Sequence, residues 1–140
     1  KIYFNSGLNI TLVGLEVYYK ARLRQDQWNN VAQSSEAMRY IFENFDPWIK
    51  YLDRHDPSKT GALEIGDALT IGAVVEPDLF SKQRCFIDVE TKGELTSGMT
   101  VGYGLSARAL APKTMNTNLC VDMNTDGFNK LFLERVKKGF

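Results

Sequence analysis

The chain has 140 residues and no net charge at neutral pH, and 44% of its residues are hydrophobic and 24% charged. These values are ordinary for one globular domain. They provide no basic surface for nucleic acid, and no apolar run is long enough to cross a membrane, so we expect neither partner.

The beginning of the chain is expected to continue a longer protein. The first residue is Lys1, and residues 2–4 are typical of the end of a helix, which Gly7 would close. Residues 10–17 form a nearly continuous apolar run with several β-branched side chains, which predicts a strand buried on both faces of a parallel sheet. Residues 22–30 are polar, and we expect them to form a connector.

A helical pattern follows, in which apolar residues recur every three or four positions. It predicts a helix near 34–45. Asp46-Pro47 interrupts the pattern. Because proline suits the first position of a helix better than its middle, we expect a kink or a new helix near 46–54. Residues 55–60 are rich in turn-forming residues and are expected to form a loop.

The stretch from Gly61 to Phe80 contains the central candidate for function. Asp67 stands at the head of a short apolar run that Glu76-Pro77 ends, and a helix that is apolar on all sides is normally buried. Asp67 can cap this helix, since the first N–H groups of a helix have no internal partners. It can also be a ligand of a hard cation on a rigid support. The cap is the commoner use, and the spacing leaves both interpretations open.

The C-terminal part of the chain predicts three strands and a helix. Residues 84–90 and 99–103 are separated by turn residues and are expected to pair as an antiparallel hairpin. Residues 118–123 form another strand. The last helix is expected from about Asn124 to residues 137–139, with an acidic first turn and a basic end. Strands that alternate with helices define an α/β fold with at least one antiparallel element.

Cys85 and Cys120 lie in apolar, strand-like runs without CxxC spacing. We interpret them as reduced core residues rather than a disulfide or a metal pair. Reduced thiols favour a cytoplasmic protein.

Taken together, four stretches resemble the C-terminal part of the inosine-uridine preferring nucleoside hydrolase family. They are SGLNITLVGLEV (6–17), GALEIGDALTIGAVVEPDLF (61–80), FIDVETKGELTSGMTV (86–101) and NTNLCVDMNTDGFNKLFLERV (116–136). The third is the most specific, because its glycines and its V-E-T pattern align over many positions without a gap.

The resemblance spans the whole chain but only the later part of the family's longer fold. It implies that residues 1–140 are the C-terminal portion of a nucleoside hydrolase-like domain. The implied fold is a mostly parallel, open α/β sheet flanked by helices, with an antiparallel hairpin. In the family, an N-terminal aspartate cluster supplies most calcium ligands and the base that activates water. These 140 residues do not include that cluster.

The same resemblance assigns a motif at the head of the short helix. The family has a His-Asp pair there, whose aspartate binds calcium and whose histidine lies near the leaving base. This chain has Gly66 and Asp67 at those positions, and nine residues separate Asp67 from Glu76-Pro77, as in the family. His55-Asp56-Pro57 resembles the pair but lies too early. Glycine cannot donate a proton, so restoring histidine at position 66 is expected to speed the release of poor leaving groups.

Further substrate-binding residues follow from the family's helix and loop that approach the nucleobase. The resemblance implies Trp48, Tyr51 and His55 here, together with Gly66. Trp48 could instead pack in the core, and His55 could lie in a solvated loop. The sequence suggests no role for Trp28.

The resemblance therefore implies a calcium-dependent hydrolase that cleaves ribonucleosides into ribose and base, acts in nucleoside salvage and forms a homo-oligomer. Asp67 is its predicted metal ligand, no catalytic residue is assigned within this chain, and the chain alone is expected to be inactive. Calcium would orient a water and lower its pKa, and the bond would break through an oxocarbenium-like state. Two alternatives stay open. One is a degenerate relative that binds a ribose-like ligand without turnover, which Gly66 favours, and the other is a related glycoside-cleaving activity.

Overall fold

The computed structural model describes residues 1–55, 62–104 and 114–138. Its elements form two compact units, each considered by itself: residues 1–14 with 80–122, and residues 15–79 with 123–140. Within the described ranges, every helix is too short or too polar to cross a lipid bilayer.

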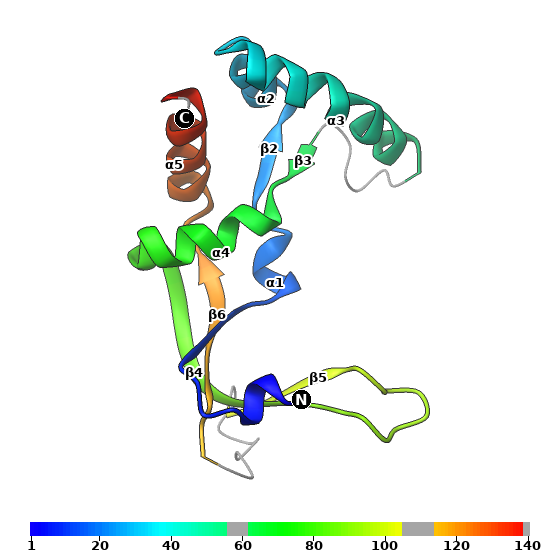
Figure 1. Ribbon diagram of the computed structural model, residues 1–140, viewed down its shortest axis with the longest axis vertical. Coiled ribbons are helices and arrows are strands. Elements are labelled where there is room, and N and C mark those ends of the chain that lie inside the picture. The colour runs from blue at the N-terminus through cyan, green and yellow to red at the C-terminus, as the bar shows by residue number, and fades with distance from the viewer. Residues whose placement is uncertain (56–61, 105–113, 139–140) are drawn as a thin grey trace. The chain divides into compact units, whose positions relative to one another are not determined.

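In its described residues, the first unit is a mixed four-stranded sheet with one short 3-10 helix. Its elements are η1 (Tyr3–Asn5), β1 (Ile10–Val13), β4 (Phe80–Val89), β5 (Thr100–Tyr103) and β6 (Thr117–Met123). The strand order is β1-β6-β4-β5. β1 runs parallel to β6, and β4 and β5 form an antiparallel hairpin (Figure 1). The predicted hairpin is thereby confirmed.

The core of this unit contains both cysteines. Cys85 and Cys120 are buried and free, and the Cys85 thiol donates a hydrogen bond to the Thr117 carbonyl oxygen at 3.8 Å. Burial raises the pKa of both thiols, which keeps them protonated and unreactive. The prediction of reduced core cysteines is confirmed.

Asn116 fixes η1 to the sheet. Its Nδ2 donates hydrogen bonds to the carbonyl oxygens of Phe4 at 2.8 Å and Ile87 at 2.9 Å. Its Oδ1 accepts one from the Ile87 N–H at 2.8 Å. One half-buried amide thus satisfies backbone groups of two segments far apart in the sequence, and each such group would be costly to leave unpaired.

The predicted strand over residues 10–17 is only partly correct. β1 ends at Val13, and Leu15–Tyr18 form the short helix α1. β1 lies at an edge of the described sheet and none of its residues is fully buried, so burial on both faces is wrong for this chain. A short apolar run does not distinguish a strand from a helical turn, because neither the 2-residue nor the 3.6-residue period can be read from it.

The second unit consists of helices around a two-stranded antiparallel sheet. Its elements are α1, β2 (Arg22–Arg24), α2 (Gln25–Ala32), α3 (Glu36–His55), β3 (Ala62–Glu64), α4 (Gly66–Val75), η3 (Pro77–Leu79) and α5 (Thr125–Lys138). β2 pairs with β3, and α2 lies against α3 (Figure 1). α2 also packs against α5. Its fully buried side chains include Val17, Leu23, Val31, Leu69 and Phe128.

The predicted connector over residues 22–30 is wrong, because this segment forms β2 and most of α2. Trp28 and Val31 lie three residues apart on α2 and are both buried. Gln27 accepts a hydrogen bond from the Arg24 N–H at 3.0 Å and so closes the first turn. Burial of one apolar face stabilises a helix whose other residues are polar.

α3 is one continuous helix, so the predicted new helix after Pro47 is wrong. Ser35 caps it by accepting a hydrogen bond from the Met38 N–H at 3.1 Å. Pro47 has no N–H to donate within the helix. Apolar residues on both sides of it pack on the same unit: Phe45 contacts Trp28, with ring centroids 6.5 Å apart, and Ile49 is buried. This packing offsets one missing hydrogen bond.

The last helix begins where the sequence predicts. The Asn124 side chain accepts a hydrogen bond from the Gly127 N–H at 2.9 Å and caps α5. Phe128 is buried, and the last turn carries Arg135, Lys137 and Lys138. The Asn124 N–H also donates to the Leu79 carbonyl oxygen at 2.8 Å, which joins α5 to the end of η3.

Candidate functional site

Asp67 lies in the first turn of α4, not at its cap. The helix begins at Gly66, Ile65 is the N-cap residue, and within the described part of the chain no side chain caps the helix by a hydrogen bond. Asp67 is exposed, and among the described residues its carboxylate has no hydrogen bond or ion pair. The cap interpretation is therefore wrong, although the first turn of a helix still favours a negative charge.

α4 is buried on one face only. Gly66, Leu69, Gly72 and Ala73 are buried. The opposite face is open, with exposed fractions of 65% for Ile71, 78% for Val74 and 53% for Val75. The predicted burial of the whole helix is wrong for this chain, because none of its described residues covers those three aliphatic side chains.

A cavity of about 460 Å³ lies in the second unit beside the start of α4. Its aromatic walls are Tyr18, Trp28, Phe45, Trp48 and Phe132.

Two carboxylates, Glu64 and Asp67, also border this cavity. Glu64 is paired with Arg22 at 3.3 Å, so Asp67 supplies its negative charge. Aromatic walls with one carboxylate at the edge suit a flat ring that carries polar groups.

Three of the residues singled out in the sequence, Trp48, Gly66 and Asp67, line this one cavity. Trp48 is 54% exposed, so the alternative of core packing is wrong. Tyr51 and His55 are outside the lining. Their rings are connected to it by stacking, because Tyr51 stacks on Trp48 and His55 stacks on Tyr51. The Tyr51 ring lies 5.4 Å from Trp48 at 14° and 4.2 Å from His55 at 22°.

His55 is the last residue of α3, and residues 56–60 of the predicted loop lie outside the described residues. Its Nδ1 is 2.8 Å from the Tyr51 carbonyl oxygen. The tautomer with a proton on Nδ1 donates this bond and leaves Nε2 as an acceptor. Trp48, Tyr51 and His55 therefore form one aromatic row along the exposed face of α3.

Trp28 and Tyr18 are two of the lining residues that the sequence analysis did not assign to the site. Trp28 is 5% exposed, and its buried Nε1 has no hydrogen-bond partner among the described residues. Its three-residue spacing from Val31 is the signal that could have placed it on a helix face. Tyr18 covers Gly66: a Cβ added to Gly66 would lie 1.6 Å from Cε2 of Tyr18. No spacing signals this contact, because it arises from the packing of α1 on α4.

A calcium ion takes six to eight oxygen ligands. Within the described residues, no group of three or more His, Cys, Asp or Glu side chains could hold a metal ion. Asp67 is exposed and unpaired there, so its carboxylate is suited to be one ligand. The other oxygens would have to come from outside the described residues.

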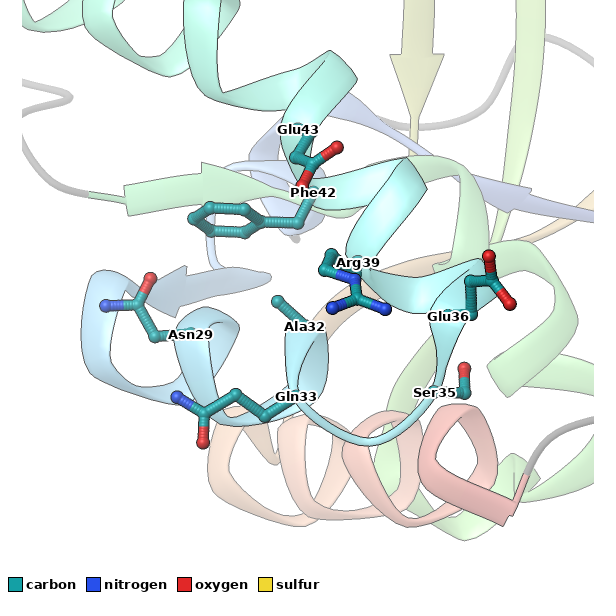
Figure 2. A pocket seen from close by; sticks show the side chains of 8 residues that line it. All are labelled: Asn29, Ala32, Gln33, Ser35, Glu36, Arg39, Phe42 and Glu43. Atoms are coloured by element: carbon teal, nitrogen blue, oxygen red, sulfur yellow. The ribbon is translucent and has the colours of Figure 1, made fainter.

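A larger hollow of about 630 Å³ lies between α2 and α3. Figure 2 shows Asn29 and Gln33 of α2 across from Arg39 and Phe42 of α3. Its polar side chains are exposed, and Arg39 and Glu36 give it both signs of charge. It contains none of the residues indicated by the sequence motif, so we assign the candidate site to the Asp67 cavity.

Comparison with solved structures shows the fold. The purine-preferring ribonucleoside hydrolase from Gardnerella vaginalis matches 98% of this chain with a TM-score of 0.79, at 24% identity and over 42% of its own chain. A plant nucleoside hydrolase matches 97% of this chain with a TM-score of 0.82, at 18% identity and over 43% of its own chain. The predicted nucleoside hydrolase-like α/β fold is confirmed, and its described sheet is mixed.

Comparison with sequences shows the family. The pyrimidine-specific ribonucleoside hydrolase of Photobacterium profundum is 30% identical over 138 residues, which are 96% of this chain and 43% of that protein. The non-specific ribonucleoside hydrolase of Escherichia coli K12 is 30% identical over 131 residues, which are 94% of this chain and 40% of that protein. The chain thus spans less than half the length of these relatives. The model of the inosine-uridine preferring nucleoside hydrolase family matches residues 1–130, and the chain belongs to this family.

Proposed function

We propose that the complete protein containing this chain cleaves the N-glycosidic bond of ribonucleosides. One observation carries the proposal: in a chain of this family, Asp67, unpaired among the described residues, borders an aromatic cavity. In the reaction, the oxygen of a water molecule bonds to C1′ of the sugar and the C–N bond breaks. The electron pair of the C–N bond leaves with the base, and the base gains a proton. The products are ribose and the free base.

In this proposal the base lies against the aromatic side of the site. Trp48, Tyr51 and His55 contact it through their stacked rings, and Gly66 contacts it from the lining of the cavity, beside the ring of Tyr18. Stacking of a base on an aromatic side chain is worth about 1–3 kcal/mol, which is enough to orient a nucleoside. The Trp48–Tyr51 and Tyr51–His55 stacks hold these rings in order before any ligand arrives.

Asp67 would be one calcium ligand, with the remaining oxygens supplied by the rest of the fold. When bound, calcium would supply an oriented water of lowered pKa. One carboxylate cannot replace six or more oxygen ligands, so the isolated 140 residues should be inactive.

The remainder of the fold would also cover α4. The Photobacterium relative extends well beyond the 43% of its length matched here, and Ile71, Val74 and Val75 present an open apolar face. Covering one such side chain contributes about 1.5–3 kcal/mol. A homo-oligomer and a role in nucleoside salvage are further parts of the proposal taken from the family, and the two free thiols favour the cytoplasm.

A second candidate function is a binding protein that holds a ribose-like ligand without turnover. Gly66 favours it, because the family's histidine is absent and the ring of Tyr18 fills the space beside the glycine. The two candidates differ in whether a base is released from a bound nucleoside.

The test measures free base released from uridine and inosine by the complete protein with calcium present. Asp67→Asn should lower the rate by roughly 100-fold or more, since changing a residue that only supports a metal ligand already costs about 10- to 100-fold. Asp78→Asn is the matched control, since Asp78 is an exposed carboxylate of the same unit outside the cavity, and it should leave the rate unchanged. Binding of nucleoside without release would support the second candidate instead.

A further inference from the structure

The side chain of Tyr18 covers the backbone at the start of α4. A Cβ added to Gly66 would lie 1.6 Å from Cε2, 1.7 Å from Cδ2 and 2.5 Å from Cζ of Tyr18. No side chain can share that space with the ring. Since Cζ carries the hydroxyl group, the polar end of Tyr18 also lies next to Gly66.

The backbone around Tyr18 is tied to α4. The Ala21 N–H donates a hydrogen bond to the Tyr18 carbonyl oxygen at 3.1 Å, and the Ile65 N–H donates to the Ala21 carbonyl oxygen at 3.1 Å. Val17, one residue earlier, is fully buried. The Tyr19 ring contacts the Tyr18 ring edge-on, with centroids 5.4 Å apart at 86°. The backbone that carries the Tyr18 ring is therefore tied to the start of α4, beside Gly66.

Tyr18 borders the same cavity as Gly66 and Asp67. A phenol offers a hydrogen-bond donor and an apolar ring face. Trp28, in the same lining, has an indole N–H without an acceptor among the described residues. Aromatic faces with N–H and O–H donors complement a flat ring that carries carbonyl oxygens and ring nitrogens. A nucleobase has these groups and gains negative charge as its glycosidic bond breaks.

We infer that Tyr18 contacts the nucleobase in the cavity and takes the place of the side chain that Gly66 lacks. Its hydroxyl donates a hydrogen bond to a carbonyl oxygen or ring nitrogen of the base, and its ring forms one wall. The bond strengthens as the base takes the electron pair of the C–N bond, while Tyr18 itself forms and breaks no covalent bond. This inference rests on the proposed function.

The experiment compares Tyr18→Phe with the matched control Tyr19→Phe in the complete protein. Phenylalanine at position 18 removes the hydroxyl and keeps the ring over Gly66, and Tyr19 lies outside the cavity lining. Rates are measured for uridine and for p-nitrophenyl riboside, whose leaving group departs without help. Tyr18→Phe should lower kcat about 10- to 100-fold for uridine and less than about threefold for p-nitrophenyl riboside, and Tyr19→Phe should change neither.

If Tyr18 had a purely structural role, Tyr18→Phe would lower the rates for uridine and for p-nitrophenyl riboside alike. Equal losses, or no loss on uridine, overturn the inference and leave the proposed function intact, since the unaltered protein still releases base. If the unaltered protein releases no base, the proposed function fails. The contact between Tyr18 and the base is then tested by nucleoside binding. Uridine is then titrated against the fluorescence of Trp28 and Trp48, and a loss of affinity of about tenfold or more in Tyr18→Ala but not in Tyr19→Ala supports the contact. Equal affinities, or no binding to the unaltered protein, overturn it.

Discussion

The ring of Tyr18 and the backbone of Gly66 occupy adjoining space, and a Cβ at position 66 would come within 1.6 Å of the ring. Only glycine fits there while the ring keeps its place. This overturns the expectation that histidine restored at position 66 would by itself assist the leaving group. The Tyr18 ring has to move, or Tyr18 has to be replaced by a smaller residue, before any side chain at position 66 can reach a ligand.

The Tyr18–Gly66 contact predicts an unusual response to alanine. Gly66→Ala should destabilise the complete protein by about 1–3 kcal/mol through overpacking, although alanine favours a helix over glycine by up to about 1 kcal/mol. In a Tyr18→Ala background the same change should be neutral or stabilising. Urea unfolding of the four proteins gives the coupling energy. Thr70→Ala, at an exposed position of α4, is the control, and additive effects of the two substitutions would refute the contact.

Asp67→Asn should separate metal binding from helix stability. The side chain makes no capping hydrogen bond and is exposed, so without calcium the free energy of unfolding should change by less than about 0.5 kcal/mol. A neutral amide is a weaker ligand, so calcium affinity should fall by about 10- to 100-fold or more. A loss of that size is found even for residues that only hydrogen-bond to a metal ligand.

Calcium is titrated against the thermal unfolding of both proteins, since a ligand of the native state raises stability by mass action. The Asp78→Asn protein should respond like the unaltered one. Identical calcium responses of Asp67→Asn and the unaltered protein would end the metal hypothesis for Asp67.

The open face of α4 predicts a covered surface in the complete protein. Val74 is 78% exposed in this chain, and the proposal places it under the remainder of the fold. Val74→Cys should react with a maleimide at least tenfold more slowly in the folded protein than in urea. Lys130→Cys, exposed on α5, should react fast in both conditions. Cys85 and Cys120 are buried in the folded chain but become reactive in urea, so the labelling of the protein without the new cysteine is subtracted in both conditions. Fast native labelling at position 74 would show that this face is open to solvent.

Glu90 predicts a pH-sensitive turn between β4 and β5. Its Oε1 accepts hydrogen bonds from the N–H groups of Lys92 at 2.6 Å and Gly93 at 3.0 Å, and these bonds lower the pKa of the Glu90 carboxyl. A lowered folded-state pKa contributes stability that is present above the unfolded value of about 4.3 and is lost as the pH falls through the folded value.

The amide proton shifts of Lys92 and Gly93 should therefore titrate with a midpoint below about 4.3. Glu90→Gln keeps an acceptor oxygen and removes the charge, so these titrations should disappear in that variant. A midpoint at or above the ordinary glutamate value would contradict the two hydrogen bonds.

The isolated 140-residue chain should release no base from uridine or inosine above the uncatalysed background. Asp67 is its predicted metal ligand, and a calcium site needs several more oxygens. The complete protein at the same concentration is the positive control. Turnover that follows the purified chain through successive columns would show that it contains a sufficient site.

The sequence by itself determined the elements whose signals are local. The hairpin follows from turn residues, which the structure places where Gly98 adopts φ of +89° and donates to the Glu90 carbonyl oxygen at 2.8 Å. The start of α5 follows from Asn124, which caps the helix as expected. A turn or a cap is made by neighbours in the chain, so its residues can be recognised without the rest of the fold.

The sequence failed where packing overrides local preference. The polar segment that contains Trp28 became a strand and a helix because one buried indole and Val31 fix its inner face. α3 runs through Pro47 because its apolar side chains contact the unit on both sides of the proline. In each case the deciding free energy comes from contacts with distant residues, which a local pattern does not contain.

For the site, the sequence determined the family and the register that singles out Gly66 and Asp67. Only the tertiary structure brought Tyr18 from α1 onto Gly66, placed Trp28 and Trp48 in the same cavity, and left Asp67 exposed rather than capping its helix. The physical reason is that the spacing of side chains encodes which face of an element is buried, whereas the partner which that face meets depends on how the whole chain packs.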